Sequence, residues 1–357
     1  MDRRKTRRIQ VGNVTIGGEA PVVVQSMNNT DTRDVKATIE QINALYAAGC
    51  ELTRVAIPDQ QAVDALKSIV AQSPIPVVAD IHFDPSLALG SIENGASKIR
   101  INPGNIGDRD AVKRIAVAAK ERCIPIRVGV NSGSVQRSIL RAHGGLNANA
   151  MVESALDSVA ILENVGFHDI VISIKSSDPM LMIESYRLLS NQTDYPFHLG
   201  VTEAGTLREG VVRSSAGIGT LLAEGIGDTI RVSLTDDPVE EIHTAYSILR
   251  ALGLRKKGIT LVSCPTCGRT CVPLVQIARD IDQRIKTMPY DLTVAVMGCA
   301  VNGPGEAKEA DLGIAGGNNE FLLFKNGRAV RKLSCDNVIE EFIAEIHAAG
   351  QEKMKEQ

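Results

Sequence analysis

The sequence predicts an α/β protein with an N-terminal (β/α)8 TIM barrel over residues 1–254 and a smaller C-terminal α/β domain over residues 255–357. Up to about residue 254, short β-branched apolar runs alternate with polar loops and stretches of helical period, which indicates parallel strands covered by helices. This unit occurs eight times, as in a TIM barrel. The length of 357 residues also exceeds that of most single-core domains. A doubly wound open sheet is the alternative fold.

The predicted barrel strands lie at spacings that leave room for a helix after each. They cover residues 22–27, 52–57, 76–81, 98–102, 125–130, 170–175, 197–202 and 229–234. Four glycines, Gly49, Gly95, Gly166 and Gly225, stand between a helical stretch and the next strand, where a left-handed residue commonly ends a helix. The last barrel helix is expected to begin with Asp237 as N-cap and Pro238 in the first helical position.

The pattern changes after residue 254. A polar joint at 255–258 precedes a strand that ends at Val262, a helix with one apolar face from Leu274 to Met288, and strands at 292–297 and 312–315. Runs at 321–324 and 328–333 flank an Asn-Gly pair, which is typical of a β-hairpin. A closing helix is expected over 338–349.

Composition excludes several classes of function. The net charge is −3, aromatic residues make up 3% and tryptophan is absent, so nucleic-acid binding is not expected. No apolar run reaches membrane-spanning length, and the basic N-terminus is not followed by a signal-peptide core. Seven cysteines without a secretion signal favour reduced thiols or metal ligation over disulfides. We therefore expect a cytoplasmic protein with no membrane partner.

Polar and charged side chains gather at the carboxyl ends of the predicted barrel strands, where barrel enzymes build their active sites. They are Arg54, Asp80, His82, Arg100, Asn102, Arg127, Asn131, Lys175, Glu203, Arg231 and Ser233. Each arginine alone could be half of a structural ion pair. Four arginines and a lysine at equivalent positions of five strands instead predict a site for a multiply charged anion such as a diphosphate. His82 by itself is expected to orient a neighbour.

Cysteines of the C-terminal domain form an incomplete ligand set. Cys264 and Cys267 form a Cys-x-x-Cys pair, and Cys299 is followed by a Gly-Pro-Gly-Glu segment that ends at Glu306. Three thiolates and a weaker oxygen ligand suit an iron–sulfur cluster with one iron open to a substrate oxygen. Structural zinc and a dithiol redox loop are the alternatives, and Glu306 could equally be a surface carboxylate. Cys50, Cys123 and Cys335 have no clustered partners and are expected to be buried apolar residues.

Six motifs spread over essentially the whole chain resemble those of one enzyme family. They are VQSMN at 24–28, ADIHF at 79–83, IRINPGN at 99–105, RVGVNSG at 127–133, CPTCG at 264–268 and GCAVNGPGE at 298–306. With them the chain resembles the bacterial 4-hydroxy-3-methylbut-2-enyl diphosphate synthases, iron–sulfur oxidoreductases of the non-mevalonate isoprenoid pathway. The form matched is the two-domain form, without the insertion of plant relatives.

The resemblance implies a reaction and a ligand set. The reaction is reductive ring opening and dehydroxylation of 2-C-methyl-D-erythritol 2,4-cyclodiphosphate, with two electrons delivered through a 4Fe-4S cluster. Cys264, Cys267 and Cys299 would bind the cluster, with Glu306 on the fourth iron; Cys271 is not part of that pattern. Arg54, Arg100, Arg127, Lys175 and Arg231 would hold the diphosphate, and Glu203 is the candidate proton donor.

The resemblance also implies partners. Flavodoxin or ferredoxin would donate the electrons, and the enzyme would be a homodimer in which the cluster domain of one subunit closes over the barrel of the other. Two rival functions remain at this point. One is a diphosphate-binding lyase or transferase with a zinc-bound tail, similar to the pterin synthases, and the other is an electron-carrying or iron-sensing module.

Overall fold

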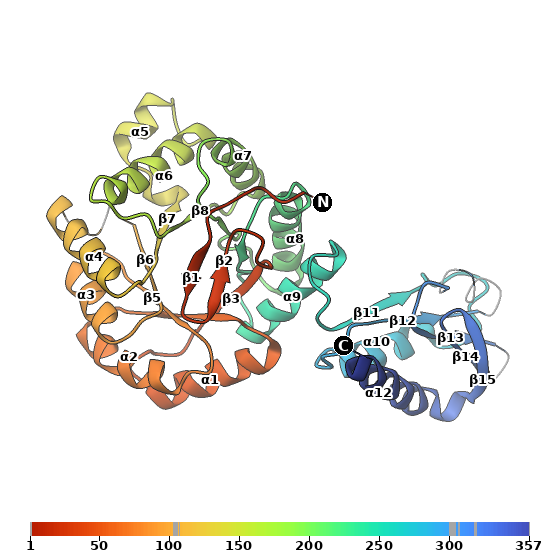
Figure 1. Ribbon diagram of the computed structural model, residues 1–357. Coiled ribbons are helices and arrows are strands. Elements are labelled where there is room, and N and C mark those ends of the chain that lie inside the picture. The colour runs from red at the N-terminus through yellow and green to blue at the C-terminus, as the bar shows by residue number, and fades with distance from the viewer. Residues whose placement is uncertain are drawn as a thin grey trace. The chain divides into compact units, whose positions relative to one another are not determined.

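The computed structural model describes residues 2–102, 106, 108–299, 305, 308–317 and 320–356. The chain forms two compact units, Met1–Arg255 and Lys256–Gln357, which are seen in Figure 1. The sequence predicts the boundary between residues 254 and 255. Each unit has its own hydrophobic core.

The larger unit is a closed parallel barrel, as predicted. Its strands are β3 (Val23–Met27), β4 (Leu52–Ala56), β5 (Val77–Asp80), β6 (Lys98–Ile101), β7 (Ile126–Asn131), β8 (Ile170–Lys175), β9 (His198–Leu199) and β10 (Thr229–Ile230). From β3 to β8 each strand pairs with the next, and β10 pairs with both β9 and β3. A parallel bridge between Ile172 of β8 and Phe197, just before β9, joins the remaining edge. The open doubly wound sheet is therefore excluded.

Helices surround the barrel strands (Figure 1). They are α1 (Val35–Ala48), α2 (Gln60–Gln72), α3 (Pro85–Glu93), α4 (Arg109–Glu121), α5 (Arg137–Ala142), α6 (Ala148–Glu163), α7 (Pro179–Ser190), α8 (Leu207–Ala223) and α9 (Pro238–Ala251). The predicted glycine caps are confirmed, with φ of 107° at Gly49, 89° at Gly95, 72° at Gly166 and 77° at Gly225. In the described part of the chain, no helix combines the length and apolarity needed to cross a bilayer.

An N-terminal hairpin that the sequence did not predict covers one end of the barrel. It consists of β1 (Ile9–Val11) and β2 (Val14–Ile16), paired antiparallel. Its buried residues Val11 and Ile16 pack against Val23 and Leu52, the first residues of β3 and β4. The hairpin thus fills the amino-terminal end of the barrel, and the polar strand ends lie at the opposite end.

The smaller unit is a five-stranded sheet with helices α10 (Leu274–Ile285) and α12 (Val338–Glu356). The parallel strands β11 (Ile259–Ser263), β12 (Leu292–Met297) and β13 (Leu312–Gly316) adjoin an antiparallel hairpin, β14 (Glu320–Lys325) and β15 (Arg328–Ser334). Helix α12 continues past its predicted end at residue 349. Gly350 lies within this helix and allows close packing, because a Cβ there would lie 2.2 Å from Cγ of Tyr290.

Candidate anion site and thiol loops

Four charged side chains from neighbouring strands are buried near the carboxyl end of the barrel. Strand pairing sets Asp80 beside Arg100 and Arg100 beside Arg127. Arg54, Asp80 and Arg100 are 5–7% exposed and Arg127 is 1% exposed. Because buried charges require partners, the contacts of these four groups decide what the site can bind.

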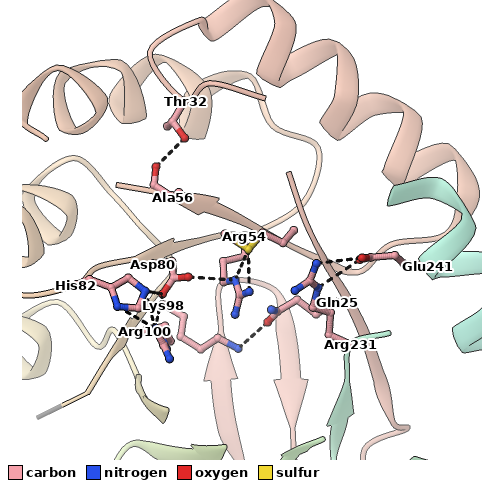
Figure 2. A network of polar contacts seen from close by, with 11 residues as sticks. Gln25, Thr32, Arg54, Ala56, Asp80, His82, Lys98, Arg100, Arg231 and Glu241 are labelled. Carbon is pink, nitrogen blue, oxygen red and sulfur yellow. Dashed lines mark hydrogen bonds and ion pairs between the residues drawn. The ribbon is translucent and has the colours of Figure 1, made fainter. Parts of the chain in front are cut away.

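Asp80 lies at the centre of an ion-pair cluster (Figure 2). Its Oδ1 is 3.2 Å from a terminal nitrogen of Arg100, and its Oδ2 is 3.6 Å from Nε of Arg54. Burial alone would raise the pKa of Asp80, but Arg54 and Arg100 lower it well below its usual value. Asp80 is therefore ionised at neutral pH, and one carboxylate serves two guanidinium groups.

His82 contacts the same cluster from the loop after β5. Its Nε2 is 2.8 Å from a terminal nitrogen of Arg100. Because a guanidinium can only donate hydrogen bonds, this nitrogen of His82 accepts, so the ring is neutral. Burial, together with Arg100, lowers the pKa of His82. The contact is the one expected of a residue that orients its neighbour.

The two arginines beside Asp80 are held by the barrel wall. A Cβ at residue 129 would lie 2.5 Å from Nε of Arg100, so only a glycine on β7 lets this guanidinium pass. Nε and Nη2 of Arg54 both donate hydrogen bonds to Sδ of Met27, over 3.2 Å and 2.8 Å. Burial lowers the pKa of Arg54 to about 10, in spite of Asp80, and the group remains charged at neutral pH.

Arg231 is fixed by a carboxylate that the sequence analysis did not single out. Glu241, in the first turn of α9, receives hydrogen bonds from NH2 of Arg231 over 3.0 Å and from Nε over 3.3 Å. The hydroxyl of Ser26 on β3 donates to the same carboxylate over 2.8 Å, and the Leu234 N–H donates over 3.1 Å. Glu241 is 2% exposed, so its carboxylate interacts with these donors instead of with water.

Replacing Glu241 by glutamine is expected to lower the free energy of unfolding by about 2 kcal/mol, because hydrogen bonds to a buried charged group are weakened. It should also raise KM for the anionic substrate through a misplaced Arg231. Urea denaturation and steady-state kinetics measure the two effects. Glu93→Gln, at an exposed position on α3, is the matched control. A wild-type denaturation midpoint and KM in Glu241→Gln would contradict this assignment.

Positive charge exceeds negative charge in the barrel interior. Nε and NH1 of Arg127 have no hydrogen-bond partner among the described residues. Burial, and then Arg54, lowers the pKa of both Arg127 and Lys175 well below their usual values. The carboxylates Asp80 and Glu241 are outnumbered by the arginines Arg54, Arg100, Arg127 and Arg231. This excess of positive charge is what the predicted anion site requires.

The other predicted site residues differ in their contacts and exposure. Asn102 and Asn131 meet at Ser134: its Oγ lies 3.4 Å from Nδ2 of Asn102 and accepts from the Asn131 N–H over 3.0 Å. Oγ of Ser233 is buried without a hydrogen-bond partner in the described chain. Glu203 is exposed beyond the end of β9, with φ of 52°, and no described side chain of the cluster bonds to it.

The three predicted thiol ligands lie in loops that follow the carboxyl ends of two parallel strands of the smaller sheet. Cys264 follows β11 directly and Cys299 comes two residues after the parallel neighbour β12. The Gly298 N–H donates to Sγ of Cys264 over 3.2 Å, and the Cys271 N–H donates to the Gly298 carbonyl over 3.2 Å. Backbone hydrogen bonds therefore already join the two loops. Glu306 lies outside the described residues.

The predicted ligand set consists of thiols, the ligands that an iron–sulfur cluster takes. Within the described chain, no three histidine, cysteine or acidic side chains are close enough together to hold one metal ion. An iron–sulfur cluster binds each thiolate through a different iron, and N–H groups directed at sulfur stabilise it. Among the remaining cysteines, Cys50 is buried as expected, but Cys123 and Cys335 are exposed, so that expectation was wrong for these two.

Both units match models of one family. Residues 6–246 match the model described as the GcpE TIM-barrel domain, and residues 260–348 match the GcpE protein C-terminal domain. The chain belongs to the GcpE family. The resemblance indicated by the sequence motifs is thereby confirmed, and the matched ranges agree with a barrel followed by a smaller domain.

Similar GcpE proteins carry an enzyme name. A protein of Ruminiclostridium cellulolyticum is 59% identical over 344 residues, which covers 96% of this chain and 98% of the relative. One of Geobacter sulfurreducens is 55% identical over 351 residues, covering 98% and 99%. Both are named 4-hydroxy-3-methylbut-2-en-1-yl diphosphate synthase (flavodoxin).

More distant solved structures share the fold of the GcpE barrel. The spore coat polysaccharide biosynthesis protein spsE of Bacillus subtilis is 12% identical, with a TM-score of 0.51 over 69% of this chain and 72% of that one. A truncated 3-deoxy-D-arabino-heptulosonate 7-phosphate synthase of Thermotoga maritima is 15% identical, with a TM-score of 0.50 over 70% and 94%. At these identities the likeness concerns the fold alone.

Proposed function

We propose that this GcpE-family chain is a 4-hydroxy-3-methylbut-2-enyl diphosphate synthase, which converts 2-C-methyl-D-erythritol 2,4-cyclodiphosphate into the linear allylic diphosphate and water. The observation that carries this function is the excess of buried cations at the carboxyl end of the barrel, in a chain whose relatives carry the enzyme's name. A cyclic diphosphate provides the two negative charges that this site lacks.

The diphosphate is bound by Arg54, Arg100, Arg127, Lys175 and Arg231. Planar guanidinium groups bind phosphate oxygens through charge-assisted hydrogen bonds, and Nε and Nη1 of Arg127, which have no partner among the described residues, are available as donors. Asp80 and Glu241 orient three of the arginines without neutralising the site. His82, Asn102, Asn131 and Ser233 then remain to bind the neutral part of the substrate.

Cys264, Cys267 and Cys299 would hold a 4Fe-4S cluster, with Glu306 as the fourth ligand. When bound, the cluster supplies the two electrons of the reduction, one at a time. The reaction also releases one water and therefore consumes protons. Glu203 is our candidate proton donor, because its left-handed backbone, with φ of 52°, is a conformation that non-glycine residues adopt at functional sites.

The proposed partners are those that the family resemblance implies. The thiols of the ligand set belong to the smaller unit and the cations to the barrel. A homodimer in which the cluster domain of one subunit reaches the barrel of the other, as the resemblance implies, would bring the two sets together. Flavodoxin, which stands in the names of the relatives, is the proposed electron donor, with ferredoxin as the alternative. We propose a cytoplasmic location, which the free cysteines support.

Anaerobic purification followed by an activity assay tests the proposal. We expect about four irons and four sulfides per chain and turnover of the cyclodiphosphate with reduced flavodoxin. Zinc without sulfide would favour the lyase or transferase, and a cluster without turnover would favour the electron carrier. Either result would overturn the proposed function.

A further inference from the structure

Lys98 is a buried amine that the proposed function does not use. It is the first residue of β6 and is 0% exposed. Strand pairing sets Lys98 beside Val78 and Arg100 beside Asp80. Lys98 therefore lies one layer deeper in the barrel than the ion-pair cluster, on the same face of β6.

The only hydrogen bond of Lys98 in the described chain crosses the barrel interior. Its Nζ is 3.5 Å from Oε1 of Gln25 on β3, and β3 and β6 are separated in the sheet by β4 and β5. Figure 2 shows the lysine extended toward Gln25, below Arg54. An amide oxygen at this distance compensates little of the charge of an ammonium group removed from water.

The charged groups around Lys98 make that charge more unfavourable. Arg127 on β7 and Arg54 on β4 both repel it, and the buried His198 on β9 also lies within its field. The nearest carboxylates are engaged elsewhere: Asp80 on β5 with Arg54 and Arg100, and Glu241 with Arg231 of the segment after β10. On β8, the amine of Lys175 is also buried, and burial and then Arg54 lower its pKa well below its usual value. Burial, Arg127 and Arg54 together lower the pKa of Lys98 well below its usual value.

We propose that Lys98 is uncharged in the empty barrel and takes up a proton when a multiply charged anion binds in the layer above it. The anion provides the missing negative charge, so the ammonium form becomes the stable one once the site is filled. Lys98 is then a second-layer binding residue, and anion binding is coupled to proton uptake. This inference rests on the proposed anion site. It goes further, because the site could bind an anion without taking up a proton.

The sign of the coupling sets the pH dependence. Because the bound state holds more protons than the free state, affinity falls as pH rises, by up to about tenfold per pH unit for one proton. The useful window is about pH 7 to about pH 9. In this range Asp80 is already ionised and His82 already neutral, since the pKa of each is lowered.

Isothermal titration calorimetry of the oxidised holoenzyme with the cyclodiphosphate tests the coupling. Each phosphorus of this ligand has one ester and one anhydride bond, so its single acidic group does not titrate near neutral pH and any proton uptake belongs to the protein. Heats measured in HEPES and in Tris, whose ionisation enthalpies differ, give the number of protons taken up. We expect Lys98→Met to take up about one proton fewer than the wild type. Lys113→Met, exposed on α4, should keep the wild-type number.

The outcomes separate this inference from the proposed function. Tight binding by the wild type with no proton uptake would overturn the inference and leave the anion site standing. Unchanged proton uptake in Lys98→Met would assign the proton to another group and likewise overturn it. No binding by the wild type would overturn both. If Lys98→Met does not fold, Lys98→Gln and the pH dependence of wild-type affinity give the same test.

Discussion

Replacing Cys264 by serine is expected to abolish both iron–sulfur content and turnover. Cys264 is bonded to the Gly298 N–H, next to Cys299, so its thiolate lies where the two ligand loops meet. A serine hydroxyl is a poor ligand for iron compared with a thiolate. Iron and sulfide, measured anaerobically, should fall from about four per chain to near zero, and reduction of the cyclodiphosphate should fall below detection.

Cys335→Ser is the control for this experiment. Cys335 is an exposed thiol of the same unit, in the short helical turn Cys335–Asn337 before α12, and it is not part of the proposed ligand set. Iron, sulfide and activity should all stay at wild-type values in this variant. A full cluster and full activity in Cys264→Ser would contradict the assignment of Cys264, while loss of both in Cys335→Ser would point to general damage by thiol replacement.

Replacing Arg127 by methionine should weaken substrate binding and stabilise the empty protein at the same time. Two unpaired donors of Arg127 are proposed to bind the diphosphate. Losing two charge-assisted hydrogen bonds of about 2 kcal/mol each corresponds to roughly a thousandfold in affinity. In the empty barrel the same guanidinium is a buried and poorly compensated charge. An apolar side chain of similar length should then raise the free energy of unfolding by about 1–4 kcal/mol.

Calorimetry with the cyclodiphosphate and urea denaturation without it measure the two effects. Arg213→Met, at an exposed position on α8, is the control and should change neither quantity appreciably. Wild-type affinity in Arg127→Met would remove this residue from the anion site. Loss of affinity together with a lower free energy of unfolding would show that Arg127 has a structural partner. That result would contradict the expectation that the buried guanidinium destabilises the empty barrel.

The barrel and the location of its site were predictable from sequence because both follow from local patterns. Strand β8 and the glycine caps were predicted at their observed residues. A cation at the end of a buried strand, such as Arg54 or Arg100, can be recognised as unusual without knowledge of its contacts. The hairpin β1–β2 was missed because its two strands are only three residues long each, too short for an alternating pattern.

The deeper parts of the site depend on contacts between distant residues. Glu241 bonds to Ser26 across 215 residues, and in sequence it is only one of two acidic residues in the first turn of α9. Lys98 was included in a predicted strand, and its position two residues before Arg100 was the signal that both side chains share one face. Nothing in the sequence indicates that Gln25 lies opposite, because that contact exists only in a closed barrel.

The bond network of Glu241 has a consequence for the newly synthesised chain. The first barrel strand supplies Ser26, the segment directly after the last strand supplies Arg231, and α9, the final helix of this unit, supplies the carboxylate between them. During translation, a ribosome that has not yet released α9 therefore carries a barrel whose Arg231 has no acidic anchor. Substrate binding that depends on an oriented Arg231 is therefore expected only after α9 has folded onto the barrel.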